Sequence, residues 1–279
     1  MTASPCPATG AWARTRTAGR PRRPRPPARN ARPPGPDPRP CGLDDSRPGR
    51  CCGGGEEIPP MKIGIIGTGN IGGTLTRRLT ALGHEVKVAN SRGPQTLREL
   101  EQETGATAAE VKDVAHDAEL VVVTIPQKAV PALPAQVFDG AAPGLVVVDT
   151  GNYYPQRDGR IAGIEDDGLT ESGWVAQQLG RPVVKAFNNI QARHLLQNGR
   201  PAGTPGRIAL PVAGDDEAGK AKVLALIEQL GFDAIDAGPL AESWRQQPGT
   251  PAYGTDLDVD GLRAALSAAS PERPAELRG

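Results

Sequence analysis

The sequence predicts an α/β fold in which a doubly wound parallel sheet is followed by a small C-terminal extension. Two observations predict it. Short apolar runs rich in β-branched residues alternate with helical patterns from Met61 onward, as in parallel sheets covered by helices. A glycine-rich turn joins the first apolar run to the first helical pattern. We expect a disordered Arg/Pro-rich extension over 1–60, a doubly wound domain over 61–240 and a partly disordered extension over 241–279.

The glycine-rich turn is the strongest motif of the chain. It follows the apolar run Ile63–Ile66 and reads G-x-G-x-x-G. The first glycine suits a tight turn, the second lets the backbone approach a pyrophosphate, and the third lets the helix pack closely on the strand. Free N–H groups at the helix start then face the phosphates. The motif predicts a dinucleotide site of Rossmann type. The residues assigned to it are Gly67, Thr68, Gly69, Asn70, Ile71 and Gly72.

The first 60 residues differ in composition from the rest. They hold 14 of the 29 prolines, and their 11 arginines against 5 acidic residues give a charge of +6, whereas the remainder carries −6. We expect disorder there, because so little apolar surface cannot offset the backbone entropy. The first strand begins at Met61, which favours Met61 as the natural start. A nucleic-acid arm is the alternative on charge alone, but we expect no nucleic-acid partner.

Cysteine usage and hydropathy narrow the class of protein further. All four cysteines lie in residues 1–60, so neither a disulfide framework nor a cysteine metal site supports the folded part, and we assign no metal. The chain lacks the apolar region of a secretory signal, and no run approaches the ~18 apolar residues of a membrane span. We expect a cytoplasmic protein without a membrane partner.

Local signals bound the elements of the first half. Gly83 and Gly105 suit helix C-termini, and Pro94 suits a first helical position. Pro131 and Pro134 force a break or a late start in the last helix of this half. The predicted strands are 61–66, 85–89, 106–110, 120–125 and 145–148, and the predicted helices are 70–82, 94–104, 111–117 and 127–138.

A second set of strands and helices follows the polar stretch 156–170. We interpret that stretch as a long loop, and loops of this length are usually functional or disordered. Asp216 is a good N-cap for the helix after it. Beyond Gly238 the pattern weakens, and the tail from about Ser267 is expected to fray. The predicted helices are 171–179, 192–197 and 217–230, and the predicted strands are 183–187, 208–212 and 232–237.

Cofactor choice is made at the end of the second strand, about 20 residues after the glycines. NAD-binding domains place an Asp or Glu there for the ribose 2′-OH, whereas NADP-binding domains offer arginine and hydroxyl groups to the 2′-phosphate. This sequence has Asn90-Ser91-Arg92 and no acid. A guanidinium can hold the phosphate by charge-assisted hydrogen bonds. The sequence therefore predicts NADP(H), with Ser91 and Arg92 as the residues that select it.

Several stretches carry a family resemblance. GIIGTGNIGGTL, ANSRG, VVVTIP and VAGDDEAGKAKV resemble the NADPH-dependent coenzyme F420 reductases (F420:NADP oxidoreductases). VVKAFN and DAGPLAESW are similar to the NADPH-binding domains of STEAP metalloreductases. The resemblance covers about residues 61–244. It implies a Rossmann domain that binds NADP(H), with a second redox partner, F420 or a flavin, held against the nicotinamide.

The resemblance also implies roles for single residues. Thr68, Ser91 and Arg92 would bind on the 2′-phosphate side. The stretch Thr124-Ile125-Pro126 would lie under the path from the adenosine to the nicotinamide, and Asn152 is assigned to the cofactor as well. The segment DTGNYYP and the stretch 246–251 depart from the archaeal F420 enzymes. Because these segments would border the acceptor, the departure concerns the substrate rather than the cofactor.

The sequence contains few residues that indicate the chemistry of the acceptor. Hydride passage between a nicotinamide and a flavin-like ring needs stacking and exclusion of water, with little acid–base help. Lys185 is the catalytic candidate, because lysine transfers protons in 3-hydroxyacid dehydrogenases with a similar N-terminal domain; its place inside a strand equally suits a structural role with a paired head group. The residues assigned to the substrate are Tyr153, Asn188, Asn189 and His194.

The function predicted on these grounds is hydride transfer between NADPH and a flavin-like acceptor such as coenzyme F420. One alternative keeps the fold and reduces a small carbonyl or imine, with Lys185 as the acid. The other is an NADPH-binding sensor without turnover, in which Tyr153, Tyr154 and the long loop form a partner surface. The expected partner is a small-molecule redox acceptor, and the sequence leaves a homodimer open.

Overall fold

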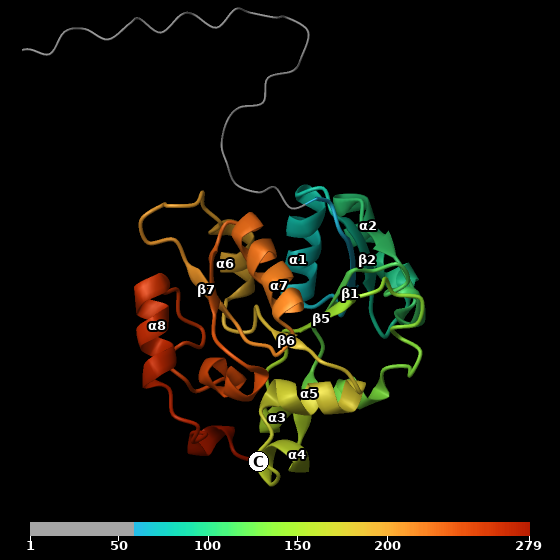
Figure 1. The fold of residues 1–279 in the computed structure, drawn as a ribbon. Helices are drawn as coiled ribbons and strands as arrows, with labels where there is room; N and C mark the ends of the chain where they lie inside the picture. The colour runs from blue at the N-terminus through green and yellow to red at the C-terminus, as the bar shows by residue number, and fades with distance from the viewer. Residues whose placement is uncertain (1–58) are drawn as a thin grey trace, which may run out of the picture. The chain divides into compact units, whose positions relative to one another are not determined.

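A parallel six-stranded sheet forms the centre of residues 59–279, the part of the chain that the computed structural model describes (Figure 1). Its strands lie in the order β3-β2-β1-β4-β5-β6, and each neighbouring pair is parallel. This is the order of dinucleotide-binding sheets, so the predicted fold class is confirmed. The strands are β1 (Lys62–Ile66), β2 (Glu85–Ala89), β3 (Thr107–Ala108), β4 (Leu120–Val123), β5 (Val146–Asp149) and β6 (Val184–Lys185).

The central strands form because their side chains are apolar on both faces. All residues of β4 and β5 are buried. Such strands need helices on both sides of the sheet to exclude water. At its carboxyl end β5 places Asp149 in register with Lys185 of β6. Two buried ionisable residues therefore stand side by side at the carboxyl ends of β5 and β6.

Helices cover both faces of the sheet. Leu75 and Leu79 of α1, Leu195 of α6 and Val223 of α7 share one hydrophobic core. The other face packs against η3 and α5, through residues such as Trp174. The elements on the two faces are α1 (Asn70–Ala81), α6 (Ala192–Gln197), α7 (Glu217–Gln229), η3 (Gln127–Ala132) and α5 (Glu171–Leu179). The elements η1 (Pro94–Leu97) and α2 (Arg98–Thr104) lie beside β2 and β3, and η2 (Val111–Asp113) packs on the second face through Val111.

Several stretches differ from the predicted elements. The strand predicted over 183–187 forms only at Val184–Lys185, and the helix predicted over 111–117 is a 3₁₀ helix at Val111–Asp113. The helix predicted over 127–138 is the shorter 3₁₀ helix η3, because Pro131 lies inside it and Pro134 follows it. The strand predicted over 106–110 forms for two residues only. The loop predicted over 156–170 contains two single-turn helices, α3 (Pro155–Asp158) and α4 (Ala162–Glu165).

The C-terminal part adds a second, smaller sheet. Strands β7 (Ala209–Val212) and β8 (Asp233–Asp236) pair in parallel, and an antiparallel bridge between Lys185 and Ala213 joins them to β6. The elements beyond are η4 (Leu240–Gln246), α8 (Val259–Ala268) and η5 (Ala275–Leu277).

We expected a partly disordered extension over 241–279, and the structure places helix α8 within it. Asp258 caps α8 by accepting from the N–H of Gly261 at 2.9 Å, and Leu262 and Leu266 of this helix are buried against the small sheet. This helix is folded because it has an apolar face to bury, and the division of the chain at residue 240 stays a prediction.

The predicted disorder of residues 1–60 falls on a segment of which only Pro59 and Pro60 are described, so it stays a prediction. Among the helices of residues 59–279, none has both the length and the hydrophobicity that crossing a bilayer requires.

Candidate dinucleotide and acceptor site

The turn between β1 and α1 requires glycine at two positions for reasons internal to the protein. Gly67 has a φ of +105°, and a Cβ atom there would collide with the carbonyl of Thr124. A Cβ atom on Gly72 would collide with the carbonyl of Gly67 and with the side chain of Thr124. The first and third glycines of the motif thus let α1 pack against β1 and against the segment after β4, as predicted.

Gly69 has no such internal reason. No heavy atom of residues 59–279 lies within 4 Å of the Cβ atom that another residue would carry there. The residue is exposed and is the N-cap of α1, where no side chain accepts from the free N–H groups. An open backbone surface at a helix N-terminus fits an anion such as a pyrophosphate. Binding of the pyrophosphate at the second glycine stays a prediction.

Asn90 organises the neighbouring loop, a role that the sequence reasoning missed. Its amide group donates to the hydroxyl oxygens of Thr68 at 3.3 Å and Thr96 at 3.0 Å. Its carbonyl oxygen accepts from the N–H of Arg92 at 2.9 Å. A buried asparagine therefore ties the glycine turn to the loop that carries Arg92, at the position where an NAD-binding domain has its acid.

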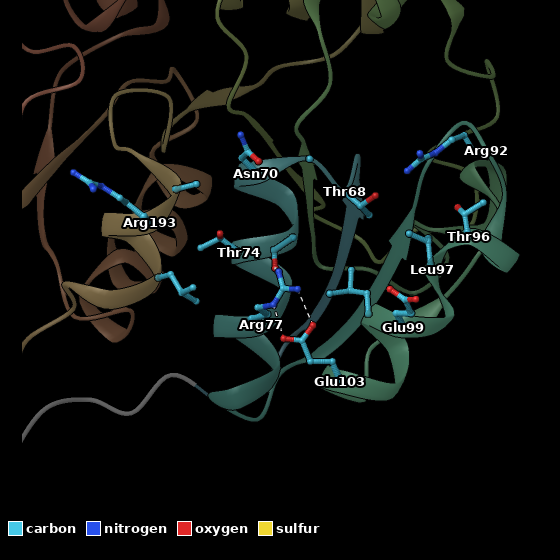
Figure 2. Close-up of a pocket in the computed structure, with 15 residues that line it drawn as sticks. Thr68, Asn70, Thr74, Arg77, Arg92, Thr96, Leu97, Glu99, Glu103 and Arg193 are labelled. Atoms are coloured by element: carbon cyan, nitrogen blue, oxygen red, sulfur yellow. Dashed lines mark hydrogen bonds and ion pairs between the residues drawn. The ribbon is translucent and has the colours of Figure 1, made fainter.

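A cavity of about 530 Å³ opens beside these two loops (Figure 2). Four residues predicted to bind the cofactor line it, namely Thr68, Gly69, Asn70 and Arg92. Arg77 also faces it, but its guanidinium pairs with Glu103 at 2.6 Å. Arg92 is exposed and lies across the cavity from α6 (Figure 2), so it is placed to take a phosphate.

The other residues assigned to the cofactor are not among those that line the cavity. Ser91 is exposed in the same loop as Arg92. Ile71 packs against the hydrophobic core from α1. The stretch 124–126 follows β4, partly exposed, and its first carbonyl lies against Gly67. The glycine turn and the segment after β4 are thus brought together.

We expect Arg92→Ala to weaken NADPH binding about 10- to 150-fold, because it removes a charge-assisted hydrogen bond worth about 1.5–3 kcal/mol. The affinity for NADH, which lacks the 2′-phosphate, should be unchanged. Titration of both nucleotides by fluorescence measures the two dissociation constants. Equal losses for NADPH and NADH would show that Arg92 does not bind the 2′-phosphate.

At the carboxyl ends of β5 and β6, Asn152 and Asn188 bind each other. The Asn152 amide donates to the Asn188 carbonyl, and the Asn188 amide donates to the Asn152 side-chain oxygen, both at 3.0 Å. Gln246 donates to the Asn188 side-chain oxygen at 2.9 Å. Asn188 is buried and its polar atoms are paired, which corrects the prediction that it contacts substrate. Asn152 is partly exposed and stays a candidate for the cofactor.

Lys185 lies in a closed ionic network. Its side chain is 0% exposed, and its ammonium group donates to the Gly151 carbonyl. The Nζ atom lies 3.5 Å from Asp149 Oδ2 and 3.8 Å from Glu171 Oε2. Arg273 holds the other Glu171 oxygen at 2.9 Å. Burial raises the pKa of Glu171, although Lys185 and Arg273 act to lower it. Local sequence patterns gave no sign of this network, because its members lie on separate elements.

Tyr153, His194 and Asn189, which were assigned to the substrate, have different surroundings. Tyr153 is fully buried, and its hydroxyl group donates to the carbonyl of Gly159 at 3.0 Å, so it supports the loop after β5. His194 has its Nδ1 atom 2.7 Å from Asp256 and accepts at Nε2 from a neighbouring arginine. Asn189 is buried and donates to the Ala252 carbonyl at 3.4 Å. The buried position and paired hydroxyl of Tyr153 correct the prediction for that residue. The substrate role of Asn189, whose side-chain oxygen has no donor in the described residues, and that of His194 stay predictions.

Comparison with known proteins places the chain in a family. Residues 62–153 match the family described as NADP oxidoreductase, coenzyme F420-dependent. A hypothetical protein of Sinorhizobium meliloti, SMa0349, is 31% identical with a TM-score of 0.61, over 71% of this chain and 95% of that one. The chain belongs to this family. The family is described as one of NADP oxidoreductases, and the predicted NADP(H) cofactor fits the family.

Two further relatives of the family were found. A "putative F420 dependent NADP-reductase" from Arthrobacter sp. FB24 is 28% identical with a TM-score of 0.54, over 66% of this chain and 87% of that one. YjhV of Escherichia coli (strain K12) is 42% identical over 79 residues, which are 28% of this chain and 50% of YjhV. The chain thus spans about half the length of this curated relative.

Proposed function

We propose that the protein transfers a hydride between NADPH and a flavin-like acceptor such as coenzyme F420. The enclosure of Lys185 carries this proposal. The residue best suited to act as an acid is 0% exposed and is held by Gly151, Asp149 and Glu171. Reduction of a carbonyl needs a positioned proton donor, whereas a flavin-like ring needs stacking and exclusion of water.

The chain's own residues would hold the cofactor by its phosphates. The open backbone at Gly69 and the N-terminus of α1 suit the pyrophosphate, and Arg92 suits the 2′-phosphate. When bound, NADPH supplies the hydride and becomes NADP⁺, and a ring nitrogen of the reduced acceptor takes its proton from water. The family description and the name of the Arthrobacter relative support an F420-type acceptor.

NADPH oxidation by the full chain should be measured in parallel with coenzyme F420, with FMN, and with a panel of small carbonyls and imines. We expect F420 or FMN to give a kcat/KM at least about tenfold above that of any carbonyl or imine. This corresponds to about 1.4 kcal/mol of transition-state stabilisation. Turnover with a carbonyl or imine alone would contradict the proposal. Tight NADPH binding without turnover of any compound would instead indicate a sensor.

A further inference from the structure

Two tyrosine hydroxyl groups meet outside the part of the chain that matches the family model. Tyr154 follows the loop after β5, and Tyr253 lies in the turns between η4 and α8. Their hydroxyl oxygens are in direct hydrogen-bond contact, although the residues are 99 positions apart. Both side chains are partly exposed. The pair is therefore accessible, unlike the buried Tyr153.

The segment that carries Tyr253 is fixed to the end of β6. The Gln246 carbonyl accepts from Asn188 at 2.7 Å, the Ala252 carbonyl accepts from Asn189, and the N–H of Gly254 donates to the Asn189 carbonyl at 2.9 Å. These bonds place Tyr253 at the carboxyl ends of the strands. That edge is where open α/β sheets bind their ligands.

Two more observations mark the same edge as a binding site. Phe187, which follows β6, has a φ of +59°, a strained conformation for a bulky residue, and such strain gathers at functional sites. Several buried side-chain oxygens of residues 59–279 also lack a donor, and buried acceptors are normally satisfied by protein, water or a ligand. Those on segments that meet here are Gln127 Oε1, Asn189 Oδ1 and Gln246 Oε1.

The tyrosine pair offers both a hydrogen-bond donor and a hydrogen-bond acceptor. When one hydroxyl donates to another, the accepting group keeps its own proton free and both oxygens keep lone pairs. Burial and the bond to Tyr154 raise the pKa of Tyr253, so this phenol stays neutral at physiological pH. The pair can therefore present one donor beside one acceptor to a ligand.

We propose that Tyr154 and Tyr253 bind the acceptor through a ring edge on which an N–H group stands next to a carbonyl. Flavins and deazaflavins carry this imide edge, and simple carbonyl compounds do not. The proposal rests on the proposed function and adds to it the two residues that recognise the acceptor. The free hydroxyl hydrogen of the tyrosine pair donates to the ring carbonyl, and a hydroxyl oxygen of the pair accepts from the ring N–H.

The test uses the full chain loaded with NADP⁺ and titrated with FMN and with N3-methyl-FMN, in which the imide N–H is blocked. We expect the wild type to bind FMN about tenfold more tightly than the methylated analogue. Tyr253→Phe and Tyr154→Phe should each weaken FMN binding about 3- to 10-fold, the loss of one net hydrogen bond. Both variants should lose the discrimination against the analogue. The double variant should lose little more than either single variant, because the hydroxyls orient each other.

Tyr153→Phe is the matched control, because it removes a neighbouring buried hydroxyl that bonds to Gly159. It should bind FMN as the wild type does. Wild-type affinity and discrimination in Tyr154→Phe and Tyr253→Phe would overturn the inference. If those variants keep full turnover with FMN or F420, the proposed function stands and only the inference fails. If the wild type binds neither FMN nor F420, both fail together.

Discussion

Replacing Lys185 with methionine is expected to lower the free energy of unfolding by about 3–5 kcal/mol. Methionine keeps the volume of the side chain but removes the ammonium group that faces Asp149 and Glu171, both of which are buried. Taking one partner from a buried ionic network leaves uncompensated charge in a medium of low polarity. Urea-induced unfolding measures the loss.

Lys220→Met is the matched control for this prediction. Lys220 is also buried, but its partners Glu217 and Asp236 are 80% and 48% exposed, so solvent can stabilise them after the change. We expect a loss of no more than about 1 kcal/mol. A similar loss for both lysines would show that the network around Lys185 contributes no more to the free energy of unfolding than the exposed partners of Lys220 do. A stable Lys185→Met variant that lost only turnover would favour the carbonyl mechanism.

The effect of Lys185→Met should depend on pH. Burial already raises the pKa of Glu171, and removing Lys185 takes away a cause that lowers it. Between the ordinary pKa of a glutamate and the raised value, the folded variant binds more protons than the unfolded chain, so its stability falls as the pH rises through that range. The difference from the wild type should be smaller at pH 5 than at pH 8. Adding Glu171→Gln should recover part of the stability at pH 8.

Gly69→Val is expected to weaken NADPH binding by at least about 100-fold, roughly 2.7 kcal/mol, while the fold is retained. Beyond the neighbouring backbone, a Cβ atom there has no atom of residues 59–279 within 4 Å, so the new side chain would extend into the space that the pyrophosphate needs. A stability loss of about 1 kcal/mol is expected, because valine is a poorer N-cap than glycine. Isothermal titration and thermal unfolding separate the two effects.

Gly72→Ala provides the opposite case within the same motif. Its Cβ atom would collide with the Gly67 carbonyl and the Thr124 side chain, so stability should fall by about 3 kcal/mol. If Gly69→Val bound NADPH as tightly as the wild type does, the assignment of the second glycine to the pyrophosphate would be contradicted.

Local patterns predicted the elements around the glycine turn well. The glycine turn, β2 and the loop with Arg92 depend on neighbours close in sequence, and strand β2 has the predicted bounds 85–89. The positions of the prolines likewise predicted that the helix after β4 is interrupted, but they did not predict how short η3 is.

The acceptor half was not predictable in the same way. Glu171 and Arg273 are 102 positions apart, and Tyr154 and Tyr253 are 99 apart. Nothing in the neighbourhood of either partner indicates the other, because only the packing of the C-terminal segment brings them together. Tyr153 was assigned to the substrate because it lies after β5, but the bond of its hydroxyl to Gly159 turns it into the core.

Cofactor and acceptor determinants lie on separate stretches of the chain. Apart from Asn152, the residues predicted to bind NADPH fall between β1 and the segment after β4, whereas Tyr253 sits in turns between η4 and α8. Surface turns accept insertions and substitutions more readily than strands do. Related proteins could therefore acquire new electron acceptors by changing the turns around Tyr253, while inheriting the nucleotide half unaltered. Diversification within the family would then be concentrated in the turns between η4 and α8.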